Sequence, residues 1–326
     1  MSTRTPDTDS VTSWVADATA APSMHNAQPW LFRFTRDSGE LLLTMDLSRA
    51  MPQTDPSTRG LHVGCGAALL NLRVAAAHAG WEARADLLPD PADPKALAAV
   101  TFALADTGDG LGALYPAISR RRTSREPFSQ EAVPQAVLDG LIGAARIEGA
   151  HLSFPGAWQV QAMLDLVRDA AYAETLSPEA RAEVARWTGT GTEDTTHQGV
   201  PSSAFGPVRY GGRAPVRDFA GDRPVEGRGY AVFEHSPCLA VLGTRDDGPQ
   251  DWLRAGQAME RVLLQATLDG LSTSLNSQAL EWPELRWAMR DPLSPTGHPQ
   301  MLIRLGYGPG VPPTPRRPVS DVLDVV

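Results

Sequence analysis

Two segments of the chain share one pattern of apolar positions. Residues 66–81 and residues 256–271 each begin with glycine, carry apolar residues at helical spacing and reach a second glycine near the end. A glycine just past a helix suits the left-handed backbone that closes many helices. We therefore predict two amphipathic helices, closed by Gly80 and Gly270.

Short apolar runs of strand length flank each predicted helix. They lie before and after it, at residues 41–47 and 100–104 for the first helix and at 238–243 and 301–305 for the second. The order strand, helix, strand thus occurs twice, which indicates a diverged internal duplication. We predict two fused units, 1–112 and 113–326, with a boundary at the turn sequence DTGDGLG. The two long helices would pack together and bury apolar stripes that neither unit covers alone.

The second unit also holds a long stretch without apolar periodicity. Residues 187–229 are rich in Gly, Pro, Ser and Thr. A loop of this length inside a compact domain is usually functional or disordered. We predict that it forms a flap over a site.

Composition narrows the class of protein. The chain has 326 residues, 42% of them hydrophobic, and a formal net charge of −9, which disfavours nucleic acid as a partner. The start MSTRTPDTDS lacks the apolar stretch of a secretory signal, and charges interrupt the apolar runs well short of the roughly 20 residues that span a bilayer. We therefore expect a cytoplasmic protein without a membrane partner. The two cysteines and seven histidines show no metal-ligand spacing, so we expect no metal site.

The sequence APSMHNAQPWLFRF, residues 21–34, passes from a helix end through a proline into a strand. Asn26 and Gln28 each offer an acceptor and donors on one amide, which matches the alternating C=O and N–H groups of a heterocycle edge. A structural reading stays open, in which Ser23 and Asn26 cap or turn the chain, Trp30 is core and His25 is a buried structural histidine.

Two basic motifs suggest an anionic ligand. In RRRTSREPF, residues 120–128, arginines and a threonine can hold a phosphate through charge-assisted hydrogen bonds, at the end of a helix expected to begin near Gly112. A second pair, Arg316 and Arg317, lies in a proline-rich tail. The alternatives are a solvated basic face for the first motif, and a polyproline recognition tail or a linker for the second.

Taken together, these motifs resemble those of the FMN-dependent nitroreductase family, in particular its fused, pseudo-dimeric branch. PSMHNAQPW looks like the family's PSxxNxQPW, RRTSREPF looks like its RRSxRxF, and LGYG followed by PTPRRP is similar to its C-terminal phosphate-binding end. The resemblance covers nearly the whole chain. It implies an α+β protein with a nitroreductase-like three-layer α/β/α fold, built from two fused units as a pseudo-dimer.

In that family two subunits share each flavin, so the resemblance divides the site between the two units. From the first unit it implies contacts to the isoalloxazine and ribityl by Pro22, Ser23, His25, Asn26 and Gln28. From the second it implies contacts to the ribityl and phosphate by Arg121, Arg122, Thr123, Arg125, Arg316 and Arg317. Near flavin N5 it implies a backbone N–H of SLNSQ, where our candidates are Asn276 and Ser277, and it adds Gln278 as a further cofactor-binding residue. No side chain is predicted to be catalytic, because the flavin carries the chemistry.

One FMN per chain is expected, because residues 154–161 read FPGAWQVQ where a second PSxxNxQPW would be needed, and the N-terminus has no RRSxR. The pseudo-dimer would then complete its own site, with further self-association left open. The expected function is hydride transfer from NAD(P)H through N5 to a nitro compound, a quinone or a related small molecule. Two alternatives stay open: an FMN-sequestering protein covered by the flap, and a flavin-dependent dehydrogenase or oxidase of a metabolic pathway.

Overall fold

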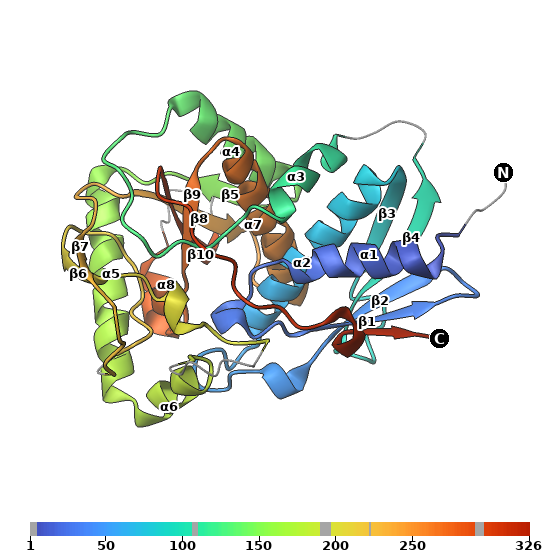
Figure 1. The fold of residues 1–326 in the computed structure, drawn as a ribbon, viewed down its shortest axis with the longest axis horizontal. Helices are drawn as coiled ribbons and strands as arrows, with labels where there is room; N and C mark the ends of the chain where they lie inside the picture. Colours follow the sequence, from blue (N-terminus) through green and yellow to red (C-terminus); the bar gives the residue numbers. More distant parts are fainter. Residues whose placement is uncertain (1–4, 106–109, 190–196, 222, 291–296) are drawn as a thin grey trace.

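A computed structural model describes residues 5–105, 110–189, 197–221, 223–290 and 297–326. Two sheets lie at either side of a layer of long helices, and the chain ends near the first sheet (Figure 1). One hydrophobic core extends through both units, from Trp14 and Leu43 in the first to Leu263 and Ile303 in the second. The predicted mixed α/β, two-unit fold is confirmed.

The first sheet has the strand order β11-β1-β2-β4-β3. All of its pairs are antiparallel except that of β11 with β1. Helices α1 and α2 pack on its inner side. The bounds of these elements are β1 Trp30–Thr35, β2 Glu40–Met45, β3 Trp81–Leu87, β4 Ala96–Leu104, β11 Leu323–Val325, α1 Thr8–Thr19 and α2 Arg59–His78.

The second sheet repeats this arrangement strand for strand. Its order β5-β8-β10-β9 matches β1-β2-β4-β3, and every neighbouring pair is again antiparallel. In each unit one long helix connects the second strand of that order to the last. The bounds are β5 His151–Ser153, β8 Cys238–Thr244, β9 Ser272–Asn276, β10 His298–Gly306, α4 Gln135–Ile147 and α7 Pro249–Leu268. The internal duplication predicted from the apolar pattern is therefore present in the fold.

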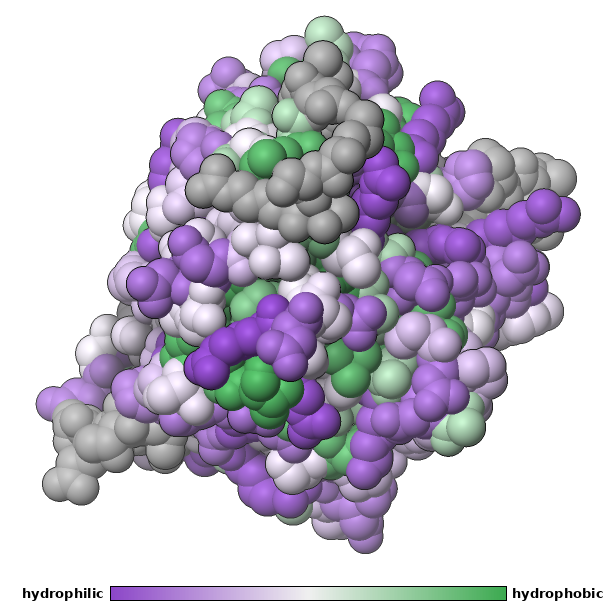
Figure 2. Space-filling view, turned by 90° about the vertical axis from the view of Figure 1, so that its right-hand side faces the viewer, coloured by the Kyte–Doolittle hydropathy of each residue, from purple (hydrophilic) through white to green (hydrophobic). Residues whose placement is uncertain are grey.

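The two units differ in their outer layers. Apolar residues of α5, such as Met163 and Val167, pack on the outer face of the second sheet and complete an α/β/α sandwich. Within the described residues, no helix packs on the outer face of the first sheet, and Figure 2 shows many hydrophilic side chains on that side. Between β5 and β8 the second unit carries an insertion that contains α5 Ala157–Leu176, α6 Pro178–Arg186, η4 Ser202–Ala204, β6 Val208–Gly211 and β7 Tyr230–Val232.

Short elements complete the chain. They are η1 Met24–Asn26, η2 Leu47–Arg49, η3 Leu111–Leu114, α3 Tyr115–Ile118, η5 Gln278–Leu280, α8 Pro283–Ala288 and η6 Val319–Asp321. The helix expected from Gly112 ends at Ile118, before the arginines of RRRTSREPF. Strand β3 was absent from the sequence prediction. The DTGDGLG boundary lies largely outside the described residues.

Glycines at the centre of α2 and α7 let these helices cross closely. A Cβ on Gly256 would lie 2.1 Å from the carbonyl oxygen of Val63 and 2.9 Å from the Cα of Gly66. A Cβ on Gly66 would lie 2.2 Å from the carbonyl oxygen of Leu253. The expectation that these glycines open the helices was wrong, because the helices begin earlier, at Arg59 and Pro249.

The closing glycines are as expected, since φ is +82° at Gly80 and +78° at Gly270.

Helix α2 is long and apolar enough to cross a membrane by length and composition. However, 83% of that apolar stretch is buried inside the protein. Its apolarity is that of a core helix packed against α1, α7 and the first sheet.

The C-terminal segment crosses from one unit to the other. After β10, residues 307–322 run across the molecule, and β11 then pairs with β1 through Phe32 and Leu323 (Figure 1). The last residues of the chain therefore add a strand to the sheet formed by the first hundred residues. No single boundary in the sequence therefore separates the two units as they lie in space.

We predict that Gly256→Ala lowers the free energy of unfolding by about 2–3 kcal/mol, because the added methyl forces the α2 and α7 backbones apart. Urea unfolding followed by circular dichroism measures it. Gly143→Ala in α4 is the matched control, since its Cβ would meet nothing within 4 Å and helix propensity should stabilise that variant slightly. Equal unfolding midpoints for the two variants would contradict the close crossing.

Candidate functional site

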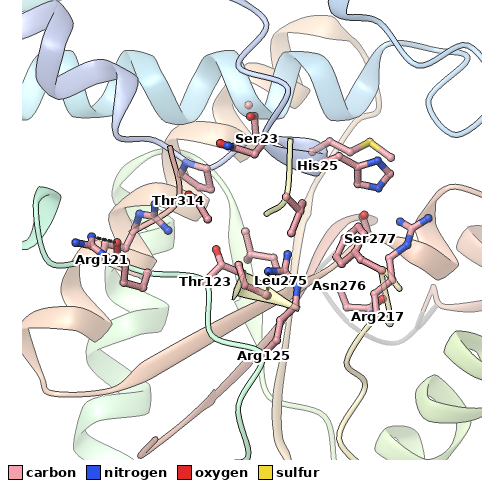
Figure 3. A pocket seen from close by; sticks show the side chains of 18 of the residues that line it. Ser23, His25, Arg121, Thr123, Arg125, Arg217, Leu275, Asn276, Ser277 and Thr314 are labelled. Carbon is pink, nitrogen blue, oxygen red and sulfur yellow. Dashed lines mark hydrogen bonds between the residues drawn. The ribbon is translucent and has the colours of Figure 1, made fainter. Parts of the chain in front are cut away.

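A cavity of about 330 Å³ lies between the two units. Segments distant in sequence form its walls: the turn before β1, the start of α2, the segment before α4, the flap, the end of β9 and the tail after β10. Figure 3 shows side chains from these segments converging on one space. The volume lies in the range of about 300–1,000 Å³ that is common for small-molecule sites.

The structure brings most of the predicted site residues together around this cavity. Those that line it are Pro22, Ser23, His25, Asn26, Arg121, Arg122, Thr123, Arg125, Asn276, Ser277 and Arg316. Gln28, Gln278 and Arg317 do not line it.

These three residues lie behind the wall, where they support it. The Gln28 carboxamide accepts a hydrogen bond from the backbone N–H of Arg317 (2.8 Å) and donates one to the carbonyl of His197 (2.7 Å). Gln278 donates to Glu174 (2.7 Å). The amide groups proposed to read a heterocycle at Gln28 are thus engaged within the protein.

The turn before β1 has an unusual backbone. His25, Asn26 and Gln28 have φ of 48°, 55° and 55°, in the left-handed region that non-glycine residues rarely adopt. Asn26 is held by the carbonyls of Gly199 (2.9 Å) and Pro315 (3.0 Å), one from the flap and one from the tail. Such strain persists where surrounding contacts over-determine it, and it often marks a functional site.

One end of the cavity is a cluster of cations, which we call the phosphate pole: Arg121, Arg122 and Arg316. Arg121 is buried, and it donates to the carbonyl of Ala20 (3.0 Å), but its Nε and Nη1 have no hydrogen-bond partner. Arg316 donates to Asn26 Oδ1 (2.9 Å), while its Nε is also without a partner. Buried donors left unpaired are costly, so they mark the position of an acceptor.

One carboxyl group faces this cluster from α7. Glu260 is fully buried, and its Oε1 lies 3.4 Å from Arg121 Nε, although neither carboxylate oxygen is hydrogen-bonded. Burial raises the pKa of Glu260 to about 7, although Arg121 lowers it. Burial, together with repulsion by Arg121, lowers the pKa of Arg316 to about 9. The pole keeps an excess of positive charge, which an anion would balance.

The opposite end, which we call the ring pole, is built on Phe219 of the flap. The Arg125 guanidinium lies 4.7 Å from the Phe219 ring centre, and that of Arg217 lies 5.5 Å from it. Arg217 pairs with Glu174 and Glu281 at 2.9 and 2.7 Å. Figure 3 shows Arg121 and Arg217 at opposite sides of the cavity, with Leu275 between them.

His25 completes the ring pole. Its imidazole meets Phe219 edge-on, with ring centres 5.3 Å apart, and neither ring nitrogen has a hydrogen-bond partner. Burial, together with the charges of Arg217 and Arg125, places the pKa of His25 well below its ordinary value. His25 is therefore a buried histidine in the cavity wall, and its ring nitrogens have no hydrogen-bond partner within the protein.

Several lining residues were missed from the sequence. Arg217 and Phe219 lie in the flap, where no periodic pattern distinguishes them, and Arg59 reads as an ordinary helix residue. Thr314 had a signal in the sequence, because it lies two residues before Arg316 in PTPRRP, and it lines the cavity beside Arg316.

The first unit has a hollow of its own at the position that the duplication makes equivalent to this cavity. It is bordered by β3, which corresponds to β9, and Ala85 and Asp86 lie where the first cavity has Leu275 and Asn276. Its charged lining is mixed: Arg73, Arg84 and Arg254 with Glu82, Asp86 and Glu148. This hollow lacks the arginine excess of the phosphate pole.

No protein-family model matches the chain. It is 33% identical to the Mycobacterium tuberculosis protein "Putative NAD(P)H nitroreductase Rv3131", over 99% of this chain and 94% of the relative. It is 32% identical to "Putative NAD(P)H nitroreductase acg" of the same species, over 98% and 96%. The chain belongs to the NAD(P)H nitroreductase family.

Solved structures were also found at low identity. A crystal structure described as "a putative nitroreductase" from Anabaena variabilis is 11% identical, with a TM-score of 0.48 over 94% of this chain and 90% of that chain. The FMN-dependent nitroreductase NfnB from Mycobacterium smegmatis, in complex with NADPH, is 17% identical, with a TM-score of 0.40 over 65% of this chain and 97% of that chain.

The lowered pKa of His25 predicts a pH dependence of stability. Below pH 6.5 the unfolded chain takes up a proton at this histidine that the folded chain does not, so acid destabilises the fold. Between pH 7.5 and 5.5 the parent should lose about 1.4 kcal/mol more unfolding free energy than His25→Phe. Urea titrations at both values measure it, with exposed His235→Phe as control. Identical pH dependence in parent and His25→Phe would show that His25 binds a proton as readily in the folded protein as in the unfolded chain.

Proposed function

We propose that the cavity binds one FMN per chain and that the protein is an NAD(P)H-dependent reductase of an electron-poor small molecule, such as a nitro compound or a quinone. The observation that carries the proposal is the buried guanidinium of Arg121 at the end of an arginine-lined cavity, whose Nε and Nη1 have no hydrogen-bond partner. The NAD(P)H nitroreductase names of the full-length relatives support the same assignment.

The phosphate pole fits the phosphate of FMN. Arg121, Arg122 and Arg316 would bind its oxygens by charge-assisted hydrogen bonds, and Thr123 and Thr314 would add hydroxyl donors. A dianionic phosphate would balance the excess charge of this end and satisfy the unpaired guanidinium nitrogens. The burial of this pole would strengthen those contacts and exclude water from them.

The remainder of the cavity fits a planar ring system. Leu275, Asn276 and Ser277 at the end of β9 would form one wall, and Ser23 would face them from the first unit. The positive charge of Arg125 would stabilise negative charge that develops there on reduction. Bound FMN would supply two-electron chemistry, accepting a hydride from a nicotinamide donor and passing it to the acceptor.

The lining segments of both units come from a single chain. We therefore propose that no second chain is needed to complete the site, although copies can associate further. We also propose a cytoplasmic location, in keeping with a nicotinamide-linked reductase.

A second candidate function is sequestration of the flavin. Three described flap residues accept hydrogen bonds from residues predicted to bind the flavin: Gly199 from Asn26, His197 from Gln28 and Ala204 from Arg125. A flap held in this way would restrict access of a donor to the ring. A pathway dehydrogenase or oxidase is the remaining alternative.

Anaerobic stopped-flow mixing of the FMN-loaded protein with NADPH and NADH tests the reductase. We expect bleaching of the flavin absorbance with at least one donor, and reoxidation by menadione or nitrofurazone. A flavin that is retained but stays oxidised with both donors favours sequestration. Oxygen consumption with a metabolite and without nicotinamide favours the dehydrogenase.

We predict that Arg121→Ala weakens FMN binding about 10- to 100-fold, because it removes a charge-assisted phosphate contact of about 1.5–3 kcal/mol. Fluorescence quenching of FMN on titration with apoprotein measures the affinity. Arg120→Ala is the control, since the neighbouring Arg120 is exposed and donates to the carbonyl of Thr267, away from the cavity. Arg316→Gln should weaken binding as well. Unchanged affinity in both cavity variants would reject the phosphate assignment.

A further inference from the structure

A second cavity, of about 870 Å³, lies beside the first. Its walls are α5, α6 and described flap residues between Pro207 and Arg228, all within the insertion between β5 and β8. Figure 1 shows α5, α6, β6 and β7 together on the side of the molecule away from the first sheet. Arg217 and Phe219 line both cavities, so the two spaces share a wall.

The charge of this second cavity is opposite to that of the whole chain. The chain has a net charge of −9. The charged residues that line the cavity are Arg168, Arg181, Arg209, Arg213, Arg217, Arg223 and Arg228, against Glu174 and Asp218. Such a local excess of arginine attracts a ligand with more than one negative charge.

The two carboxylates that line the second cavity each form an ion pair with one of its arginines. Glu174 pairs with Arg217 (2.9 Å) and Asp218 with Arg228 (2.8 Å). Each of these acids is matched by one arginine of the cavity. Two residues outside the lining also pair with its arginines: Asp165 with Arg168 (3.1 Å) and Glu281 with Arg217 (2.7 Å).

Three of the other arginines meet no carboxylate in the described chain. Arg209 donates from Nη1 to the carbonyl of Ala214 (3.0 Å). Arg223 donates from Nη2 to the hydroxyl of Thr188 (2.6 Å) and the carbonyl of Phe219 (2.8 Å), and from Nε to the carbonyl of Ala220 (3.2 Å). The side chain of Arg213 is exposed and has no hydrogen-bond or ion-pair partner within the described residues. Arg209 and Arg213 therefore keep most of their guanidinium N–H groups for a phosphate, which arginine binds in bidentate fashion, and Arg223 keeps its Nη1.

The cavity also has an apolar part, formed by Leu164, Val167, Val184, Val208 and Phe233. A ligand that suits both parts has a flat or apolar body and a phosphorylated end. A purine nucleotide with two phosphate groups has this chemistry, and guanidinium planes also stack on heterocycles.

We propose that this second cavity binds the adenosine 2′,5′-bisphosphate end of NADPH and so selects NADPH over NADH. The inference rests on the proposed function, because that function makes the electron donor a nicotinamide dinucleotide. With its nicotinamide in the first cavity, the donor must continue into an adjoining space. The second cavity adjoins the first at Arg217 and Phe219, so the donor would reach it past these two side chains. The 2′-phosphate, which NADH lacks, would meet Arg209, Arg213 and Arg223.

Calorimetric titration of the FMN-loaded protein with adenosine 2′,5′-bisphosphate and with adenosine 5′-monophosphate tests the proposal without turnover. We expect the bisphosphate to bind about tenfold more tightly or better, in keeping with one added charge-assisted phosphate contact. The double variant Arg209→Glu, Arg213→Glu should abolish this preference and reduce the NADPH-to-NADH ratio of kcat/KM by about tenfold or more.

The control is Arg36→Glu, Arg146→Glu, which changes the net charge equally at exposed positions outside the cavity and should keep the preference. Equal binding of the two nucleotides to the parent, or a preference that survives in the cavity variant, overturns the proposal. A separate titration with FMN decides the proposed function: failure to bind FMN rejects that function, whereas loss of nucleotide discrimination alone rejects only this inference.

Discussion

The close crossing of α2 and α7 is the constraint on which the rest of the molecule depends. With glycine at 66 and 256, the two backbones approach within a distance that no side chain permits. The helices form the shared inner layer between the sheets, so their separation fixes how far apart the two units lie. The cavity lies at the seam of those units, and its walls keep their positions only while that separation holds.

Gene duplication followed by divergence explains the asymmetry of the chain. Both units keep the same four-strand order, but the insertion after β5 gives the second unit an outer helical layer, the flap and a second cavity. At the equivalent position of the first unit, mixed charges replace the arginine cluster. One unit has thus become mainly a structural partner, which contributes the turn of Ser23 to Asn26 to the site of the other.

Much of the fold could be read from the sequence, because apolar periodicity reports which face of an element is buried. The two long helices, their closing glycines and the strands around them follow from that pattern. The roles of Gly66 and Gly256 could not be read, since a need for close approach depends on the partner helix rather than on neighbours in the chain. Strand β3, WEARADL, alternates in burial but carries charges on its exposed face, and so lacks the apolar run that indicated the other strands.

The site was predictable where short motifs carry its chemistry, at PSMHNAQPW and RRTSREPF. The sequence does not show that Gln28 turns away to support the tail, because its orientation depends on the left-handed backbone at that turn. Arg217 and Phe219 could not be predicted either, because the flap sequence has no apolar periodicity. Their role depends on the cavity that the flap covers, which exists only in the folded chain.

The crossing of the C-terminal segment makes the two units mechanically inseparable at the site. Residues 311–314 and Arg316 line the cavity. This segment is anchored upstream by β10 in one sheet and downstream by β11 in the other, where Val326 pairs with Phe34 and Arg36. A load applied to the carboxyl terminus, as by a fused tag or a processive protease, would therefore pull first on the pairing of β11 with β1 and then on Arg316. The contacts of Arg316 at the cavity would then be among the first to break when force unfolds the chain from its carboxyl terminus.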